Sequence, residues 1–168
     1  DELLDLGYQF KIMSSTRLTY PEFRRTAFVR IPQAIEDELP GESAATRDAM
    51  LAEGFMKWLS RRDQSNPFFA FLFFDAPHGP YSYPEEFAKF QPAQPAANYV
   101  TVGRHAMPAM KNAYKNALYF DDHLTGRILE RLKSDGLLQN TIIAISGDHG
   151  EEFYDCLLYT SDAADDLL

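Results

Sequence analysis

Cysteine, basic charge and long apolar runs are all scarce in this chain. Its 168 residues include one cysteine, Cys156. This single cysteine does not indicate whether the protein lies in an oxidising or a reducing compartment. Lys and Arg total 16 against 25 Asp and Glu, so the net charge is −9. Nucleic acid and polybasic membrane contacts both require basic surfaces, so neither is expected here. No apolar run reaches the roughly 18 residues of a membrane-spanning helix, so none is expected within this stretch.

The segment 156–168 is expected to be foreign to the protein. The residues from Cys156 to Asp165 match the translation of a common sequencing-library adaptor. The alternative, a natural acidic tail, does not explain that match. A translated adaptor says nothing about the fold, so we divide the chain into two parts. Residues 1–155 form a partial domain, and residues 156–168 are a read-through tail.

Three segments of the remaining chain have the pattern of β-strands. They are residues 9–13, the apolar run 68–74 and the β-branched run 141–146. The second run is bounded by Pro67 and Asp75, and its continuous apolar character predicts a strand buried on both faces. The overall content of 45% hydrophobic residues is enough for the packed core that such strands require.

Two helices are expected between these strands. The first opens at Ser43, and its apolar residues recur at spacings of three and four: Met50, Leu51, Phe55, Trp58 and Leu59. The second runs from about Ala109 to Ser134 with the stripe Ala113, Ala117, Phe120, Leu124, Ile128 and Leu132, and it ends at Asp135 and Gly136. Alternating strands and helices predict an α/β fold in three layers, with a mostly parallel sheet flanked by helices.

Candidate ligands follow two of the expected strands. Asp148 and His149 come directly after the run 141–146, and His78 follows the run 68–74. Because ligands of parallel sheets bind beyond the carboxyl ends of the strands, we expect these side chains to converge. A carboxylate and an imidazole together suit a divalent ion such as zinc, manganese, magnesium or calcium. The alternative for Asp148 and His149 is an ordinary polar turn.

His78 is the candidate catalytic and substrate-binding residue. It could bind a substrate oxygen or protonate a leaving group, and the alternative is a loop histidine that caps a backbone carbonyl. The long loop 76–108 that carries it is typical of binding or lid elements. His105 and His123 are expected at the surface. Asp121 and Asp122 are expected to pair with a basic residue and anchor the loop. Ser14 and Ser15 are weaker candidates for residues at the same sheet edge.

Several of these segments resemble the sulfatase family of the alkaline-phosphatase superfamily. They are the strand and Ala-Pro-His-Gly-Pro-Tyr loop of residues 68–81, the helical run 115–129 and the motif of residues 141–152. Within the superfamily, the sequence is most similar to the periplasmic domain of the YejM/PbgA inner-membrane proteins. Gly7-Tyr8-Gln9-Phe10 and Tyr81-Ser82-Tyr83-Pro84 carry part of this likeness, and the matching segments are spread over nearly all of residues 1–155.

The resemblance implies a metal-dependent hydrolase or transferase for sulfate or phosphate esters. Asp148 and His149 would ligate the divalent metal ion, and His78 would contact the phosphoryl or sulfuryl group. A histidine at position 149 favours the phosphoryl-transfer branch over the calcium sulfatases. The family's nucleophile and a further carboxylate ligand are expected upstream of Asp1, so this fragment by itself is expected to lack turnover.

The same resemblance leaves a second function open. A YejM/PbgA-like protein would be a non-catalytic regulator that binds lipid A or phospholipid. In either case the resemblance implies a location at the periplasmic face of a bacterial inner membrane, with an anchor in missing N-terminal helices. The expected partner is then an anionic ester or a lipid head group.

Overall fold

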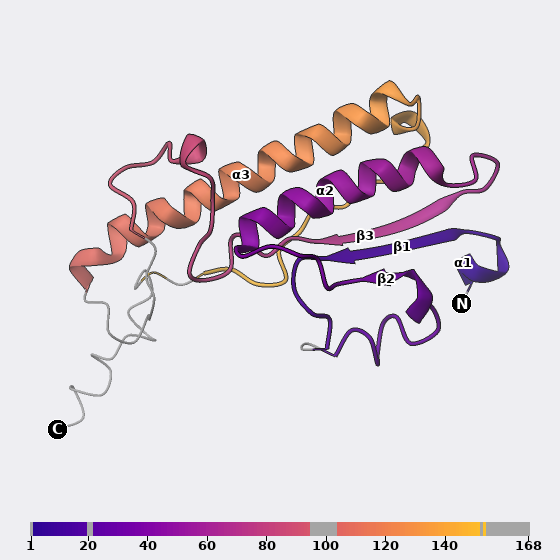
Figure 1. Cartoon of the computed structure of the whole chain (residues 1–168), viewed down its shortest axis with the longest axis horizontal. Coiled ribbons are helices and arrows are strands. Elements are labelled where there is room, and N and C mark those ends of the chain that lie inside the picture. Colours follow the sequence, from indigo (N-terminus) through magenta and orange to yellow (C-terminus); the bar gives the residue numbers. More distant parts are fainter. Residues whose placement is uncertain (1, 20–21, 95–103, 152, 154–168) are drawn as a thin grey trace.

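The computed structural model of the chain describes residues 2–19, 22–94, 104–151 and 153. Its elements along the chain are α1 (Glu2–Asp5), β1 (Gln9–Ser14), η1 (Pro32–Ala34), β2 (Ile35–Glu36), α2 (Ala44–Arg61), β3 (Phe68–Phe73), η2 (Glu85–Phe87), η4 (Arg104–Ala106), α3 (Met107–Ser134) and η5 (Leu138–Asn140). Figure 1 shows α2 and α3 lying side by side over one face of the sheet. The predicted α/β class, a parallel sheet flanked by helices, is confirmed.

The sheet has the strand order β2-β1-β3, and both pairings are parallel. β1 and β3 are in register from Gln9 opposite Phe68 to Ser14 opposite Phe73. Their carboxyl ends are therefore level, and the residues that follow each strand emerge at one edge. This edge positions the candidate site.

Side chains of β1 alternate between two cores, as the pleat of a strand requires. Met13 faces the core under α2 and α3, together with Leu51, Phe55 and Leu124. Ile12 faces the other core, where the turns after β1 and η1 cover the sheet. Gly54 of α2 faces β1, and a Cβ there would come within 2.7 Å of the Met13 methyl, so a larger residue would require the flexible end of Met13 to move.

The helix boundaries follow local signals in the sequence. Ser43 is the N-cap of α2, and its hydroxyl accepts a hydrogen bond from the backbone N–H of Thr46 at 3.1 Å. After α3, Gly136 adopts a positive φ of 68°, which glycine tolerates without steric cost. The predicted apolar stripe of α3 is buried throughout. The stripe of α2 is buried at Leu51, Phe55 and Leu59, but Met50 is exposed.

Two expectations about strands are wrong. β3 packs against a core on each face, with Phe68 and Leu72 on one side and Phe71 on the other, but it is only half-buried and Phe69 is exposed. The run 141–146 forms no strand, because no strand among the described residues pairs with it. Its side chains are correspondingly open to solvent, with Ile142 99% and Ile145 73% exposed.

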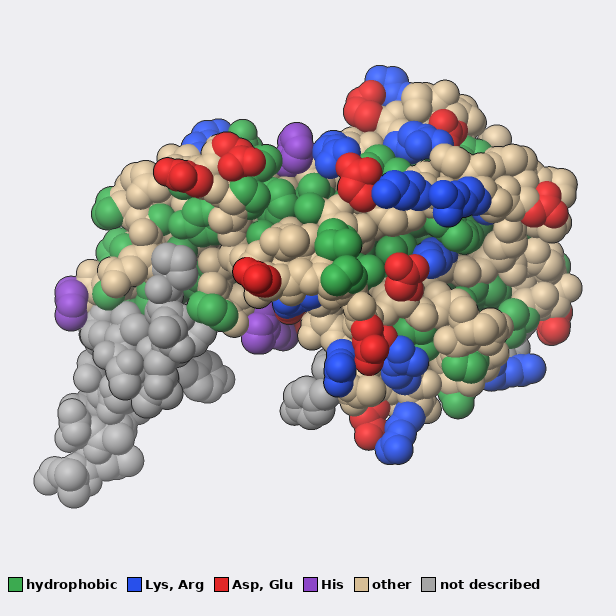
Figure 2. Space-filling model, in the orientation of Figure 1, with side chains coloured by type: hydrophobic (Ala, Val, Ile, Leu, Met, Phe, Trp, Pro, Cys, Tyr) green, Lys and Arg blue, Asp and Glu red, His purple; other side chains and the backbone are tan. Residues whose placement is uncertain are grey.

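Charged side chains of both signs are interspersed on the face shown in Figure 2, with hydrophobic side chains between them. Within the described residues, no helix has both the length and the apolar character needed to cross a membrane.

Candidate functional site

The level ends of β1 and β3 bring together residues far apart in the sequence. Ser14 and Ser15 close β1 and are buried, and Asp75 and Ala76 follow β3. The backbone N–H of Ser15 donates to the carbonyl of Phe73 at 3.0 Å, which extends the pairing of the two strands by one step. The two serines therefore do reach the predicted edge of the sheet.

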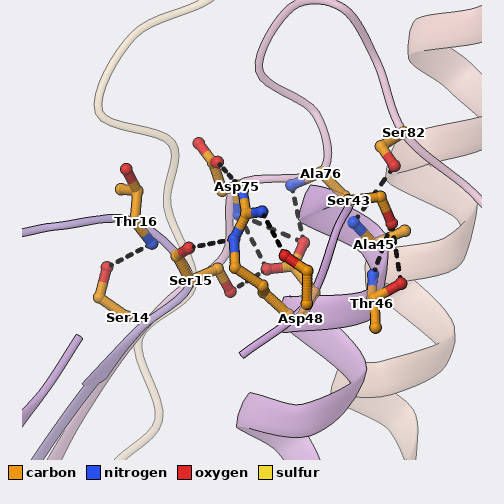
Figure 3. Close-up of polar contacts among 12 residues, drawn as sticks. Ser14, Ser15, Thr16, Ser43, Ala45, Thr46, Asp48, Asp75, Ala76 and Ser82 are labelled. Carbon is orange, nitrogen blue, oxygen red and sulfur yellow. Dashed lines mark hydrogen bonds and ion pairs between the residues drawn. The ribbon is translucent and has the colours of Figure 1, made fainter. Parts of the chain in front are cut away.

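The carboxylate of Asp48, in the first turns of α2, organises this edge (Figure 3). It accepts the backbone N–H of Ala76 at 2.7 Å, the N–H of Asp75 at 3.0 Å and the hydroxyl of Ser15. Asp48 is fully buried. Burial raises the pKa of Asp48, and these three hydrogen bonds oppose the rise. Because both backbone N–H groups are already paired, neither is available to bind a substrate oxygen.

The loop that carries His78 is closed at its base. The N–H of Ser82 donates to the carbonyl of Ala76 at 3.0 Å, and the hydroxyl of Ser82 accepts the N–H of Ala45 at 3.3 Å. Tyr81, only 1% exposed, packs against Tyr114 of α3. His78 itself is exposed, and its backbone N–H donates to the carbonyl of Asp75 at 3.0 Å. The imidazole thus stands on a loop whose two ends are fixed to α2 and α3.

A second buried carboxyl group, that of Asp121, lies on α3, the helix that packs against the helix of Asp48. Asp121 is 9% exposed, and its Oδ1 has no hydrogen-bond partner among the described residues. Burial raises the pKa of Asp121 to about 9, and the negative charge of Asp48, a hydrogen bond to Asp48 and the charge of Asp75 add to the rise. Asp121 is therefore a neutral carboxylic acid at physiological pH.

Arg47 of α2 brings a positive charge to this edge. Its Nε donates to the carbonyl of Ser15 at 2.6 Å, and one of its terminal nitrogens contacts a carboxylate oxygen of Asp75 at 3.3 Å. In the described part of the chain, the edge thus holds the guanidinium of Arg47 and the carboxylates of Asp48 and Asp75, while Asp121 is neutral. An anionic ester would be repelled by this surplus of acid unless a cation reversed the local field.

Asp148 and His149 are exposed and contact each other. The N–H of His149 donates to Asp148 Oδ1 at 3.0 Å, and His149 Nε2 lies 3.9 Å from the same oxygen. His149 Nδ1 lies 2.8 Å from the carbonyl of Gly150. That contact places the ring proton on Nδ1 and raises the pKa of His149, with a further rise from Asp148. The tautomer leaves Nε2 free, as in histidines that ligate metals.

This donor set fits a divalent metal as part of its coordination shell. A carboxylate and an imidazole Nε2 supply two ligands of the right chemistry. Nowhere in the described ranges do three or more His, Cys, Asp or Glu side chains come together as a metal cluster. The remaining ligands would have to come from elsewhere.

Phe153 links the segment that carries Asp148 and His149 to the His78 loop. It is buried, and its ring centroid lies 6.2 Å from that of Tyr81 and 5.5 Å from that of Tyr114. Lys111 lies over the same ring at 5.8 Å. Figure 1 shows the segment after η5 returning to the carboxyl end of the sheet. Convergence of His78 with Asp148 and His149 on one ligand stays a prediction.

Other sequence-based assignments have mixed outcomes. His105 and His123 are exposed, as predicted, although the His123 ring packs 5.1 Å from that of Phe87. Asp121 does not pair with a basic residue in the described part of the chain, because it is buried against Asp48. Instead, Asn116 anchors the loop, exchanging hydrogen bonds of 2.8 and 3.1 Å with the backbone of Phe90.

Sequence reasoning missed Asp48, Arg47 and the role of Asp121. A signal for both acids was present, since each interrupts the apolar face of a helix. Asp48 falls between Ala45 and Leu51, and Asp121 falls between Ala117 and Leu124. An acid on a buried stripe needs a donor or a proton partner. The predicted tail 156–168 lies outside the described residues.

Comparisons with known proteins identify the family and the fold. A family model described as Sulfatase matches residues 7–166. No curated protein matches the chain. Among solved structures, the chain is similar to the C-terminal periplasmic domain of the phosphoethanolamine transferase EptC from Campylobacter jejuni, with a TM-score of 0.60 and 20% identity. The match covers 80% of this chain and 40% of that one, so the chain spans about two fifths of its structural neighbour.

Proposed function

Because the chain belongs to the sulfatase family, we propose that the whole protein is a metal-dependent hydrolase or transferase that acts on phosphate or sulfate esters. The observation that supports the proposal is the packing of the Phe153 ring. Its packing against Tyr81 ties the segment after Asp148 and His149 to the loop after His78. Two candidate metal ligands and a candidate substrate ligand are thereby attached to one edge of a parallel sheet, where α/β proteins bind ligands.

Each candidate residue has a distinct role in the proposed reaction. Asp148 would offer a carboxylate oxygen to the metal, and His149 would offer Nε2 while its Nδ1–H is held by the carbonyl of Gly150. A divalent metal bound there would act as a Lewis acid on an ester oxygen. His78 is exposed, and its imidazole can donate a hydrogen bond or a proton to that ester.

Phosphate esters are the first substrates to test. The structural neighbour EptC is a phosphoethanolamine transferase, and the part of it that matches this chain belongs to its C-terminal periplasmic domain. That likeness also supports a periplasmic location for this protein. The negative charges of Asp48 and Asp75 at this edge would disfavour an anionic ester, and a bound metal would supply the positive charge that offsets them.

The test is the metal content of the full-length protein and of its Asp148→Ala variant, measured by elemental analysis after dialysis. We expect a bound divalent ion in the parent and at least a roughly 100-fold loss of affinity in the variant, more than is typical when a residue behind a ligand is changed. Asp122→Ala, which removes an exposed carboxylate of α3, is the matched control and should retain the metal.

Turnover of 4-nitrophenyl phosphate and 4-nitrophenyl sulfate by the same proteins separates the ester classes. Unchanged metal content in Asp148→Ala would refute the ligand assignment. A full-length protein that binds anionic lipid vesicles, holds no metal and turns over neither ester would instead support the non-catalytic regulator.

A further inference from the structure

Asp48 and Asp121 form a pair of buried carboxyl groups that no catalytic role explains. Asp48 comes from α2 and Asp121 from α3, so the pair lies where the two helices meet above the sheet. Asp48 is 0% exposed and Asp121 is 9% exposed. Because two buried carboxylates on packed helices would repel each other strongly if both were ionised, we expect one of them to be protonated.

The hydrogen bonds show which member carries the charge. Asp48 accepts three donors, from Ser15, Asp75 and Ala76. A carboxylate is the form that satisfies several donors at once. Asp121 accepts none of these, and its Oδ1 has no hydrogen-bond partner among the described residues. Asp48 is therefore the carboxylate, and Asp121 is the carboxylic acid beside it.

The donors bound by Asp48 are the base of the His78 loop. Asp75 and Ala76 follow β3 directly, and Ser15 is the first residue after β1. The carboxylate thus fixes the ends of both strands to α2. Hydrogen bonds from backbone N–H groups to an ionised acceptor are stronger than neutral ones, so the charge on Asp48 matters for the clamp.

We propose that Asp48 and Asp121 are positioning residues, a proton-sharing pair that holds the start of the His78 loop in place. The role of the loop in ester chemistry rests on the proposed function, whereas the clamp itself does not. The charged groups acting on Asp121 are Asp48 from α2 and Asp75 from the end of β3. Arg47 contacts the carboxylate of Asp75 and the carbonyl of Ser15.

Because Asp121 carries a proton in the folded chain, the pair makes the free energy of unfolding depend on pH. The pKa of Asp121 is about 9 in the folded chain and about 4 in an unfolded one. Between these values the folded state holds a proton that the unfolded state has released, so this pair's contribution to stability falls as pH rises. One proton changes the unfolding equilibrium constant by about tenfold per pH unit.

The first measurement is urea unfolding of the 168-residue chain and its Asp121→Asn variant between about pH 5 and pH 9, the window in which the two states differ by a proton. Asparagine keeps a donor toward Asp48 but cannot ionise. We expect the ratio of the two unfolding constants to change by up to about tenfold per pH unit, with the variant gaining relative stability at high pH. Asp122→Asn, the exposed neighbour, should follow the parent profile. An Asp121→Asn profile parallel to the parent would overturn the proposal.

The second measurement is amide hydrogen exchange in the Asp48→Asn variant, followed by NMR. An asparagine offers one acceptor oxygen in place of two, so the amides of Asp75 and Ala76 should exchange at least about tenfold faster, and the His78 ring signals should shift. Unchanged exchange at both amides would contradict the clamp. Should Asp48→Asn fail to fold, the pH profile of Asp121→Asn decides alone. Neither measurement uses a metal or an ester, so the clamp and the proposed function fail independently.

Discussion

The two halves of the candidate site are held in contrasting ways. The loop with His78 rises from a buried base, where Asp48 binds both Asp75 and Ala76 and where Ser82 closes the loop. Asp148 and His149 are exposed, and they form hydrogen bonds with each other and with Gly150. The downstream contact of Phe153 attaches their segment to the rest of the described fold near the site.

This contrast shows that the His78 loop is pre-organised, whereas the segment with Asp148 and His149 is attached through the packing of Phe153. A loop fixed by buried hydrogen bonds keeps its geometry without a ligand. Exposed, locally bonded residues open at low free energy, because few buried contacts oppose the motion. A metal bound to Asp148 and His149 would then order the second half around the first.

The largest effect is expected from breaking the buried base. Asp48→Ala leaves the N–H groups of Asp75 and Ala76 and the hydroxyl of Ser15 without their acceptor. Each unpaired buried donor is unfavourable by about 1–3 kcal/mol, so the free energy of unfolding should fall by about 4 kcal/mol. Urea unfolding at neutral pH measures it. A loss below about 1 kcal/mol, less than one unpaired donor, would show that the base does not hold the loop.

A smaller effect is expected from removing the packing of Phe153. Phe153→Ala removes a buried ring from its contacts with Tyr81 and Tyr114. We expect a loss of about 3 kcal/mol, the lower end for a buried Phe→Ala change, because few rings surround it. Backbone NMR order parameters at residues 142–150 should fall, while the amides of Asp75 and Ala76 stay protected from exchange. Phe69→Ala, an exposed Phe on β3, is the control. Equal loosening of both halves would contradict the comparison.

The smallest effect is expected at the exposed half itself. Asp148→Ala removes a solvated carboxylate whose partners are the N–H and ring of His149. Surface changes of this kind alter the free energy of unfolding by less than about 0.5 kcal/mol. Thermal unfolding of the metal-free chain checks this, and it also shows that any loss of metal in the same variant is not a loss of folding. A large drop in stability would mean that Asp148 supports the fold.

Local signals in the sequence predicted the elements that depend on near neighbours. The Ser43 cap, the stripe of α3 and the stop at Gly136 are all properties of a few consecutive residues. Both β1 and β3 were also predicted close to their observed bounds. The run 141–146 was predicted wrongly, because an extended segment becomes a strand only when another strand pairs with its backbone.

The acidic residues of the site show the same difference between what local sequence predicts and what depends on tertiary structure. The sequence by itself determined that Asp148, His149 and His78 follow apolar runs, which was enough to name them as candidates and to suggest the family. It could not show that Asp48 and Asp121, far apart in the chain, lie together under α2 and α3. Tertiary structure decided that, since burial and the approach of two helices turn one acid into a carboxylate clamp and the other into its proton-bearing partner.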